Sequence, residues 1–201
     1  MFQEKVQKRL NLFIIGTNQP VEISDKSFHL TEIKKDGKAD LRVDVSSPCI
    51  LFRDLENKKL QYFNNQKCAD YVMFENTEDT WCVHILEFKR TVTPKRWEED
   101  IKLQFAGALQ NAIALAGVLD VDIKLEQVQL YTAYRNDKIR DVANPVKQRF
   151  QMHDRQSETS RTKDQDWNQQ MVAIDFPGIV PLEHHKIPLN IADGTGTYQL
   201  S

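Results

Sequence analysis

Two segments of the chain decide its fold: Lys67-Cys-Ala-Asp-Tyr-Val-Met-Phe74 and Trp81-Cys-Val-His-Ile-Leu-Glu-Phe-Lys-Arg90. Both are rich in β-branched and aromatic residues, and the polar stretch Glu75–Thr80 between them is typical of a turn. The pattern predicts one strand over Ala69–Phe74 and a second over Trp81–Arg90. Because only a short turn separates them, we expect the two strands to pair as a hairpin.

A long helix and a further strand follow this hairpin. Apolar residues recur at helical spacing and predict a helix over about Lys95–Ala116, with Gly117 as its stop. The stretch Gln127–Tyr134 alternates apolar and polar residues, which predicts a strand in the sheet that the helix covers. The order strand, strand, helix, strand indicates an α/β fold with a central mixed β-sheet flanked by helices.

The two ends of the chain carry weaker patterns. The spacing of Phe2, Val6 and Leu10 predicts an amphipathic helix over Phe2–Ile15. Residues 151–170 are almost wholly polar and predict a loop or a frayed helix. Further strands are predicted over Leu41–Val45, over Cys49–Phe52 and Leu60–Phe63 as a hairpin, over Met171–Phe176, and over Lys186–Ile191 at a sheet edge. We expect residues 1–201 to form a single domain with extra N-terminal strands and a C-terminal extension over 171–201.

Composition limits the classes of function. The chain has 201 residues, 40% of them hydrophobic, which is enough for one folded core, and its formal charge of −2 means that nucleic acid would need a local basic patch. No stretch approaches the roughly 20 apolar residues of a membrane span, and the N-terminus lacks the pattern of a secretory signal. We expect a cytoplasmic protein without a membrane partner. Cys49, Cys68 and Cys82 form no Cys-x-x-Cys pair, which favours buried thiols over a disulfide scaffold or a zinc site.

Three charged residues of the predicted hairpin point to a metal site. Side chains of a strand alternate between its faces, so Glu87 and Lys89 share one face while Phe88 packs on the other. Asp70 lies 17 residues before Glu87 on the neighbouring strand, a spacing that allows the two carboxylates to lie side by side. Paired carboxylates need a cation, and oxygen ligands suit Mg²⁺ or Mn²⁺.

Asp70, Glu87-Phe88-Lys89, the following helix and the next strand resemble the core of the PD-(D/E)XK nuclease superfamily, over about residues 49–135. The resemblance implies a restriction-endonuclease-like core that hydrolyses phosphodiester bonds of DNA or RNA. It also implies that Asp70, Glu87 and the Phe88 carbonyl hold a divalent ion while Lys89 orients or activates the attacking water. Gln104 would match the glutamine that some members carry in the helix.

The sequence departs from that superfamily at several positions. Ala69 stands where a proline is usual, and Ala108 stands where some members have a tyrosine after the glutamine. A glutamate from the first helix is an optional element, for which Glu4 and Glu56 are the candidates.

Basic residues near the start of the long helix are candidate phosphate ligands. Lys95, Arg96 and Lys102 would lie near the proposed site and bind nucleic acid there, and a solvated helix face is the alternative. His84 lies among apolar strand residues and favours a core role, and the pair His184-His185 favours a surface or packing role.

The sequence leaves three functions open. The first is a metal-dependent nuclease, completed by a homo-oligomer or a larger complex because a nuclease must also hold the nucleic-acid backbone. The second is a non-catalytic nuclease-like binding or assembly module in a nucleic-acid-processing or defence complex. The third is a globular protein in which the ion pair of Glu87 and Lys89 is simply structural, with both side chains emerging from the sheet at the end of the strand and Asp70 capping the start of the hairpin.

Overall fold

The computed structural model describes residues 2–13, 21–34, 37–55, 64–77, 80–139 and 165–200. Within these ranges the strands form two sheets. The larger is a seven-stranded mixed sheet in the order β1-β4-β5-β6-β7-β9-β8, and the smaller is a three-stranded sheet in the order β10-β3-β2. In the larger sheet the strands are β1 (Val21–Ser24), β4 (Cys49–Arg53), β5 (Tyr71–Asn76), β6 (Trp81–Val92), β7 (Ile123–Asp137), β8 (Met171–Val172) and β9 (Leu182–Pro188). In the smaller sheet they are β2 (Ser27–Lys34), β3 (Gly37–Asp44) and β10 (Thr195–Gln199).

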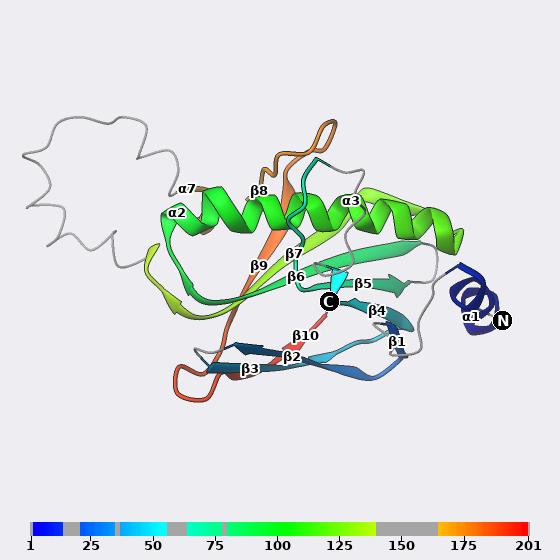
Figure 1. Cartoon of the computed structure of the whole chain (residues 1–201), viewed down its shortest axis with the longest axis horizontal. Helices are drawn as coiled ribbons and strands as arrows, with labels where there is room; N and C mark the ends of the chain where they lie inside the picture. Colours follow the sequence, from blue (N-terminus) through cyan, green and yellow to red (C-terminus); the bar gives the residue numbers. More distant parts are fainter. Residues whose placement is uncertain are drawn as a thin grey trace, which may run out of the picture.

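The large sheet is buried on both faces. The helix α3 (Lys102–Leu119) covers one face and the three-stranded sheet covers the other (Figure 1). Strand β6 shows the division, because Val83 and Ile85 join the core beneath α3 whereas Leu86 and Phe88 join the core between the sheets. A strand with both faces buried is apolar nearly throughout, which explains the dense hydrophobic character of this segment.

The predicted α/β fold with a central mixed sheet is confirmed. Strands β5 and β6 pair antiparallel as the predicted hairpin, and β7 lies parallel to β6 on its other side. The bounds differ from those predicted: β5 begins at Tyr71 rather than Ala69, so Asp70 precedes the strand, and β6 continues to Val92.

The long helix departs from its predicted form. It begins as the short α2 (Pro94–Arg96), continues through one π-helical stretch, η2 (Trp97–Ile101), and then becomes α3. The predicted stop at Gly117 is wrong, because α3 continues to Leu119. The next residue, Asp120, has the left-handed conformation, with φ of 58°, that ends helices. Aspartate tolerates this conformation better than most residues do, so a glycine is not needed here.

The smaller sheet was not predicted from the sequence. The predicted strand Leu41–Val45 belongs to β3, and its partners β2 and β10 come from opposite ends of the chain. Strand β4 pairs with β1 and β5, and its predicted hairpin partner, Leu60–Phe63, lies outside the described residues. Helix α1 (Phe2–Phe13) confirms the first predicted helix over its described part.

The C-terminal part also differs. The predicted strand over Met171–Phe176 is wrong beyond Val172. The predicted edge strand over Lys186–Ile191 overlaps the end of β9, which ends at Pro188. Within the described chain β8 pairs only with Leu182 and Glu183, so the stretch from Lys186 to Pro188 pairs with β7 and lies at the edge of the sheet. Most of the predicted polar loop over 151–170 lies outside the described residues, and its end forms the short helix α7 (Gln165–Asn168). None of the helices within the described ranges combines the length and apolar character needed to cross a bilayer.

Candidate metal centre

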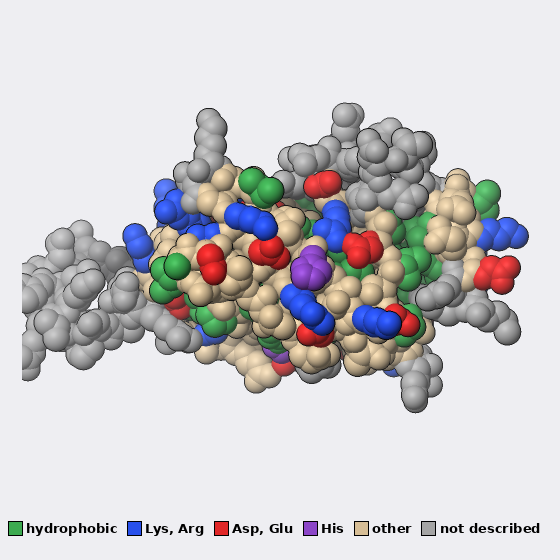
Figure 2. Space-filling view, turned by 90° about the horizontal axis from the view of Figure 1, so that it is seen from below, with side chains coloured by type: hydrophobic (Ala, Val, Ile, Leu, Met, Phe, Trp, Pro, Cys, Tyr) green, Lys and Arg blue, Asp and Glu red, His purple; other side chains and the backbone are tan. Residues whose placement is uncertain are grey.

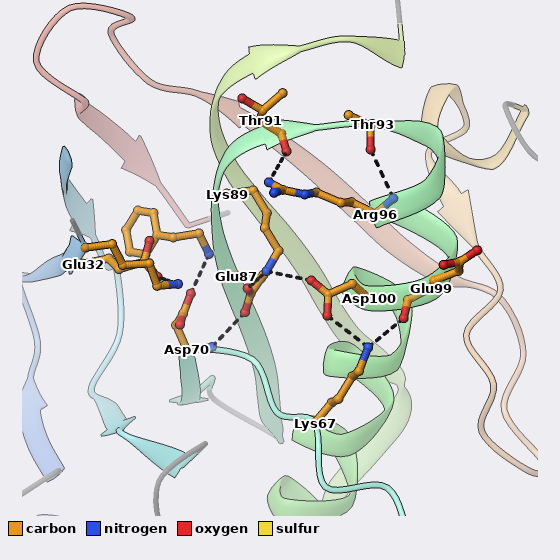
Figure 3. A network of polar contacts seen from close by, with 12 residues as sticks. Glu32, Lys67, Asp70, Glu87, Lys89, Thr91, Thr93, Arg96, Glu99 and Asp100 are labelled. Atoms are coloured by element: carbon orange, nitrogen blue, oxygen red, sulfur yellow. Dashed lines mark hydrogen bonds and ion pairs between the residues drawn. The ribbon is translucent and has the colours of Figure 1, made fainter. Parts of the chain in front are cut away.

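The hairpin places Asp70 opposite Glu87. Strands β5 and β6 pair in register up to Tyr71 and Leu86, so the next position on each side joins Asp70 to Glu87. The backbone N–H of Asp70 donates to Glu87 Oε2 at 3.2 Å, and the backbone N–H of Phe88 donates to Asp70 Oδ2 at 2.7 Å (Figure 3). The two carboxylates therefore lie side by side at the beginning of β5.

The backbone of Phe88 borders the same place. Phe88 lies beyond the last β5–β6 pair, and its N–H points to the carboxylate of Asp70. The N–H and C=O of one strand residue face the same side of the strand. The Phe88 carbonyl is therefore directed toward the edge of β6 that Asp70 occupies, which is where the resemblance requires a third oxygen.

Lys89 completes the group from the α3 side of the sheet. Its ammonium contacts Glu87 Oε1 and lies 3.3 Å from Asp100 Oδ2 of η2. Glu87 is fully buried, and only 11% of the Lys89 side chain is exposed. The prediction that Glu87 and Lys89 emerge from the sheet is therefore wrong, whereas the ion pair between them is present and buried.

The helical side of the centre is fixed by the turn that follows β6. Thr93 caps α2 by accepting the N–H of Arg96 at 3.2 Å, and Pro94 occupies the first helical position, where a missing N–H costs nothing. The π-helical stretch η2 follows, a form that is frequent at functional sites. It buries Trp97 while Asp100 points toward Lys89 (Figure 3).

Lys67 ties this helix to the segment before Asp70. Its ammonium donates to the Glu99 carbonyl at 2.7 Å and to Asp100 Oδ1 at 3.1 Å. The close approach depends on Gly107 of α3, because a Cβ there would lie 1.8 Å from the carbonyl oxygen of Lys67. Gly107 thus sets how near the helix comes to the chain that carries Asp70.

Burial and like charge put strain on the acid pair. Burial raises the pKa of Asp70 from its usual 3.8 to about 6, although the hydrogen bond from the Phe88 N–H opposes this. Burial, followed by the charge of Asp70, raises the pKa of Glu87 well above its ordinary value. Burial acts to lower the pKa of Lys89, but the charges of Glu87 and Asp100 outweigh it and raise that pKa. Strongly raised pKa values of buried carboxyl groups are common at functional sites.

The donor set suits a small, hard cation. Mg²⁺ is usually held by one or two carboxylates together with waters, and Mn²⁺ accepts the same oxygen ligands. Asp70 and Glu87 supply two carboxylates, the Phe88 carbonyl is directed to the same place, and Asp70 Oδ1 takes no part in the hydrogen bonds described above. No cluster of three or more His, Cys, Asp or Glu side chains suited to a metal occurs in the part of the chain that the structure describes. The two carboxylates and the Phe88 carbonyl offer oxygen ligands, which suit Mg²⁺ or Mn²⁺, and none of the nitrogen or sulfur ligands that zinc prefers.

The structure brings some of the other predicted residues to this centre and not others. Arg96 lines a pocket beside Lys89. Lys95 is 80% exposed and pairs with Glu99 at 3.8 Å. Lys102 does not reach the carboxylate pair, because its ammonium binds Glu98 and Asp166 instead.

Gln104 lies on α3 one turn after Asp100, with its amide oxygen buried and no hydrogen-bond partner among the described residues. Of the two optional glutamates, only Glu4 lies in the described part of the chain, and it does not reach the centre. Glu4 is exposed on α1, whose Arg9 holds Asp120 at the far end of α3, and Glu56 lies outside the described residues.

Sequence reasoning missed Asp100 and Lys67. Asp100 belongs to the acidic run Glu98-Glu99-Asp100, in which nothing singles out the third residue. A signal was available in its spacing from Gln104, since residues four apart share a helix face. Lys67 stands three residues before Asp70 and carries no pattern of its own.

The histidines and cysteines lie elsewhere. His84 is buried, and its ring nitrogens lie 3.0 Å from the Tyr131 hydroxyl and 3.1 Å from Glu75 Oε2, which confirms a satisfied core role. His184 is buried among aromatic rings, and burial lowers its pKa to about 3. All three cysteines are free: Cys49 and Cys68 are buried and Cys82 is half-buried.

Comparison with known proteins adds no assignment: no family model, no curated protein and no solved structure matches this chain.

Proposed function

We propose that this chain is a divalent-metal-dependent nuclease that hydrolyses phosphodiester bonds of DNA or RNA. The observation that carries the proposal is the adjacent pair of acids, Asp70 and buried Glu87, with the ammonium of Lys89 on the same face. A purely structural ion pair gains nothing from a second acid placed beside the first, because burial and like charge both oppose ionisation. A bound divalent cation removes that conflict.

Each residue has a separate task in this mechanism. Asp70, Glu87 and the carbonyl of Phe88 hold the ion, which, when bound, neutralises charge on the phosphoryl oxygens and lowers the pKa of water. Lys89 donates hydrogen bonds to the attacking water and fixes its approach to the phosphorus. The bond from the water oxygen to phosphorus forms as the bond from phosphorus to the leaving oxygen breaks. The water gives a proton to solvent, and the leaving oxygen takes one up.

Asp100 and Lys67 act as positioning residues. Asp100 holds the ammonium of Lys89 at 3.3 Å, and Lys67 holds Asp100 at 3.1 Å. A lysine side chain has four rotatable bonds, so the direction of its ammonium depends on such partners. The chain order β5, β6, helix, β7 is also the one that the resemblance to the PD-(D/E)XK superfamily implies. Free thiols fit a reducing compartment, and the proposal places the protein in the cytoplasm.

One observation favours a second candidate, a non-catalytic nuclease-like module. The ammonium of Lys89 is already engaged by Glu87 and Asp100, so the centre is partly charge-balanced without any cation. Such a module would bind nucleic acid or a partner protein and cleave nothing.

A cleavage assay separates the two functions. Fluorescent single- and double-stranded DNA and RNA are incubated with the protein in Mg²⁺, in Mn²⁺ and in EDTA. The tested variants are Asp70→Asn and Lys89→Gln, and the matched controls are Asp122→Asn and Lys124→Gln, which change exposed residues outside the centre. We expect cleavage that needs the metal, is lost in both tested variants and is kept in both controls.

Two other results would count against the nuclease proposal. Cleavage that persists in EDTA or in a folded Asp70→Asn variant would mean that another group performs the chemistry. Binding without cleavage of any substrate, combined with no heat of Mg²⁺ or Mn²⁺ binding in calorimetry, would favour the non-catalytic module.

A further inference from the structure

A pocket of about 300 Å³ opens beside Lys89. Its walls come from the β2–β3 hairpin of the smaller sheet, the end of β6, the start of the helix and β7. Lys89 and Asp100 belong both to this pocket and to the candidate metal centre. A molecule bound in the pocket therefore touches the same ammonium that faces Glu87.

The lining of the pocket is strongly basic although the whole chain is slightly acidic. Six basic side chains line it against two acidic ones, Glu32 and Asp100, whereas the formal charge of the chain is −2. The basic residues are Lys34, Lys38, Lys89, Arg90, Arg96 and Arg135.

The outer face of the smaller sheet has no such excess. Acidic and basic side chains are interspersed there (Figure 2), as in the pair of Arg42 with Asp44 at 2.8 Å. The excess of basic side chains therefore belongs to the lining of the pocket, where Lys34 pairs with Glu32 and Lys38 with Asp40 while Lys89 is held by Glu87 and Asp100.

Arg135 lies in a slot that two glycines leave open. A Cβ built on Gly194 would lie 2.1 Å from Arg135 Nη2, and a Cβ built on Gly37 would lie 3.5 Å from Nη1. Both glycines have positive φ, 75° and 136°, a conformation that favours glycine over other residues. The backbone of the β2–β3 hairpin and that of the loop before β10 thus hold the guanidinium between them.

Backbone carbonyls, and not carboxylates, bind the two arginines. Arg135 Nη2 donates to the Asp193 carbonyl at 3.2 Å, and Arg96 Nη1 donates to the Thr91 carbonyl at 3.3 Å. Neither arginine makes an ion pair within the described part of the chain. A guanidinium has five N–H donors, so each keeps donors and its full charge for an anion, and its planar fork matches the oxygens of a phosphate.

We propose that this pocket binds a phosphate group of the nucleic-acid strand that lies at the metal centre, with Arg135 and Arg96 as its main donors. The identity of the ligand rests on the proposed function, whereas the anion site rests on the pocket itself. The smaller sheet then has a task of its own, because its hairpin supplies one wall of a second phosphate site beside the scissile one.

The test measures binding without cleavage. Short fluorescent single strands of DNA and RNA, with and without a 5′-phosphate, are titrated with the full chain in EDTA by fluorescence anisotropy. The variants are Arg135→Gln and Arg96→Gln, and the matched control is Arg42→Gln, which removes the same charge from the outer face of β3. Thermal unfolding shows which variants are folded, and Arg135→Lys provides a second variant that keeps the charge but loses the planar fork.

The expected result is a loss of affinity of about tenfold or more in each glutamine variant, as for other hydrogen bonds to charged groups. The slope of log Kd against log salt should fall by about 0.7 for each lost phosphate contact. If the phosphate is terminal, only the 5′-phosphorylated strands lose affinity. If it is an internal phosphodiester, strands with and without the 5′-phosphate lose affinity equally.

The inference is overturned if the folded Arg135 and Arg96 variants bind every strand as Arg42→Gln does. That result is distinguishable from failure of the proposed function. Metal-dependent cleavage with unchanged Kd and KM in the arginine variants would leave the nuclease proposal standing and refute the pocket. Arginine-dependent binding without any cleavage would leave the phosphate pocket standing and refute the nuclease proposal.

Discussion

Replacing Asp70 by asparagine should stabilise the metal-free protein. The burial of Asp70 raises its pKa from 3.8 to about 6, so the unfolded chain releases this proton at lower pH than the folded chain does. Below about pH 4, Asp70 is protonated in both states and does not oppose folding. As the pH rises from about 4 to about 6, the unfolded chain loses this proton first, and the free energy of unfolding falls. A difference of about two pKa units corresponds to roughly 3 kcal/mol. An asparagine side chain at this position would keep an acceptor for the Phe88 N–H and would carry no charge.

The measurement is thermal unfolding of wild type and Asp70→Asn in EDTA across a pH series. For a chain of this length, roughly 3 kcal/mol corresponds to a gain of about 6–12 °C in Tm. The gain should be full above about pH 6 and should vanish near pH 4. Asp40→Asn is the control, because Lys38 lowers the pKa of Asp40 through a hydrogen bond, and its removal should not stabilise the protein.

Addition of Mg²⁺ or Mn²⁺ should then reverse the order. A ligand that binds only the folded state, present at about one thousand times its Kd, adds roughly 4.1 kcal/mol, which exceeds the roughly 3 kcal/mol gained by the variant, and only the wild type retains both carboxylates. An Asp70→Asn variant that unfolds at a lower temperature than wild type in EDTA at pH 8 would refute the electrostatic conflict between Asp70 and Glu87.

Three further predictions test the surroundings of the centre. Gly107→Ala should destabilise the protein by about 1–3 kcal/mol in urea unfolding, since the new Cβ collides with the Lys67 carbonyl. Asp100→Asn should lower kcat more than it raises KM, because it releases the ammonium of Lys89, and should change the free energy of unfolding by less than about 1 kcal/mol at this half-exposed position. His184 is buried neutral, so protonation opposes folding: from about pH 6 down to 3, wild type should lose about 1.4 kcal/mol per pH unit relative to His184→Gln in chemical unfolding. Parallel stability curves for these two proteins would show that His184 does not remain neutral.

The parts of the fold that were predicted correctly depend on local patterns. The hairpin of β5 and β6 joins neighbouring segments, and its side chains alternate in a way that sequence spacing determines. The side-by-side position of Asp70 and Glu87 follows from that pairing alone. The helix was also predictable, because its apolar repeat is long, although the end at Asp120 depends on a backbone conformation that any of several residues adopts.

The parts that were missed depend on contacts between distant segments. Strand β10 pairs parallel with β3, with Thr195 opposite Asp40, and no local pattern indicates which of many short segments will meet. The basic pocket could not be predicted from the sequence for the same reason. Its cations come from β2, β3, β6, α2 and β7, each with only one or two charges, so no run of basic residues marks it in the sequence.

The position of the charged residues along β6 supports a functional site more strongly than the resemblance does. On the face toward α3, Val83 and Ile85 are completely buried, as is Glu87, and the next residue on that face, Lys89, has only 11% of its side chain exposed. A fold that needed only stability would continue the apolar row there, because a buried ion pair is often weaker than a packed apolar pair. Here a second acid, Asp70, is added beside the first and weakens the arrangement further in the absence of a cation. Sites that oppose stability in this way are commonly kept for chemistry.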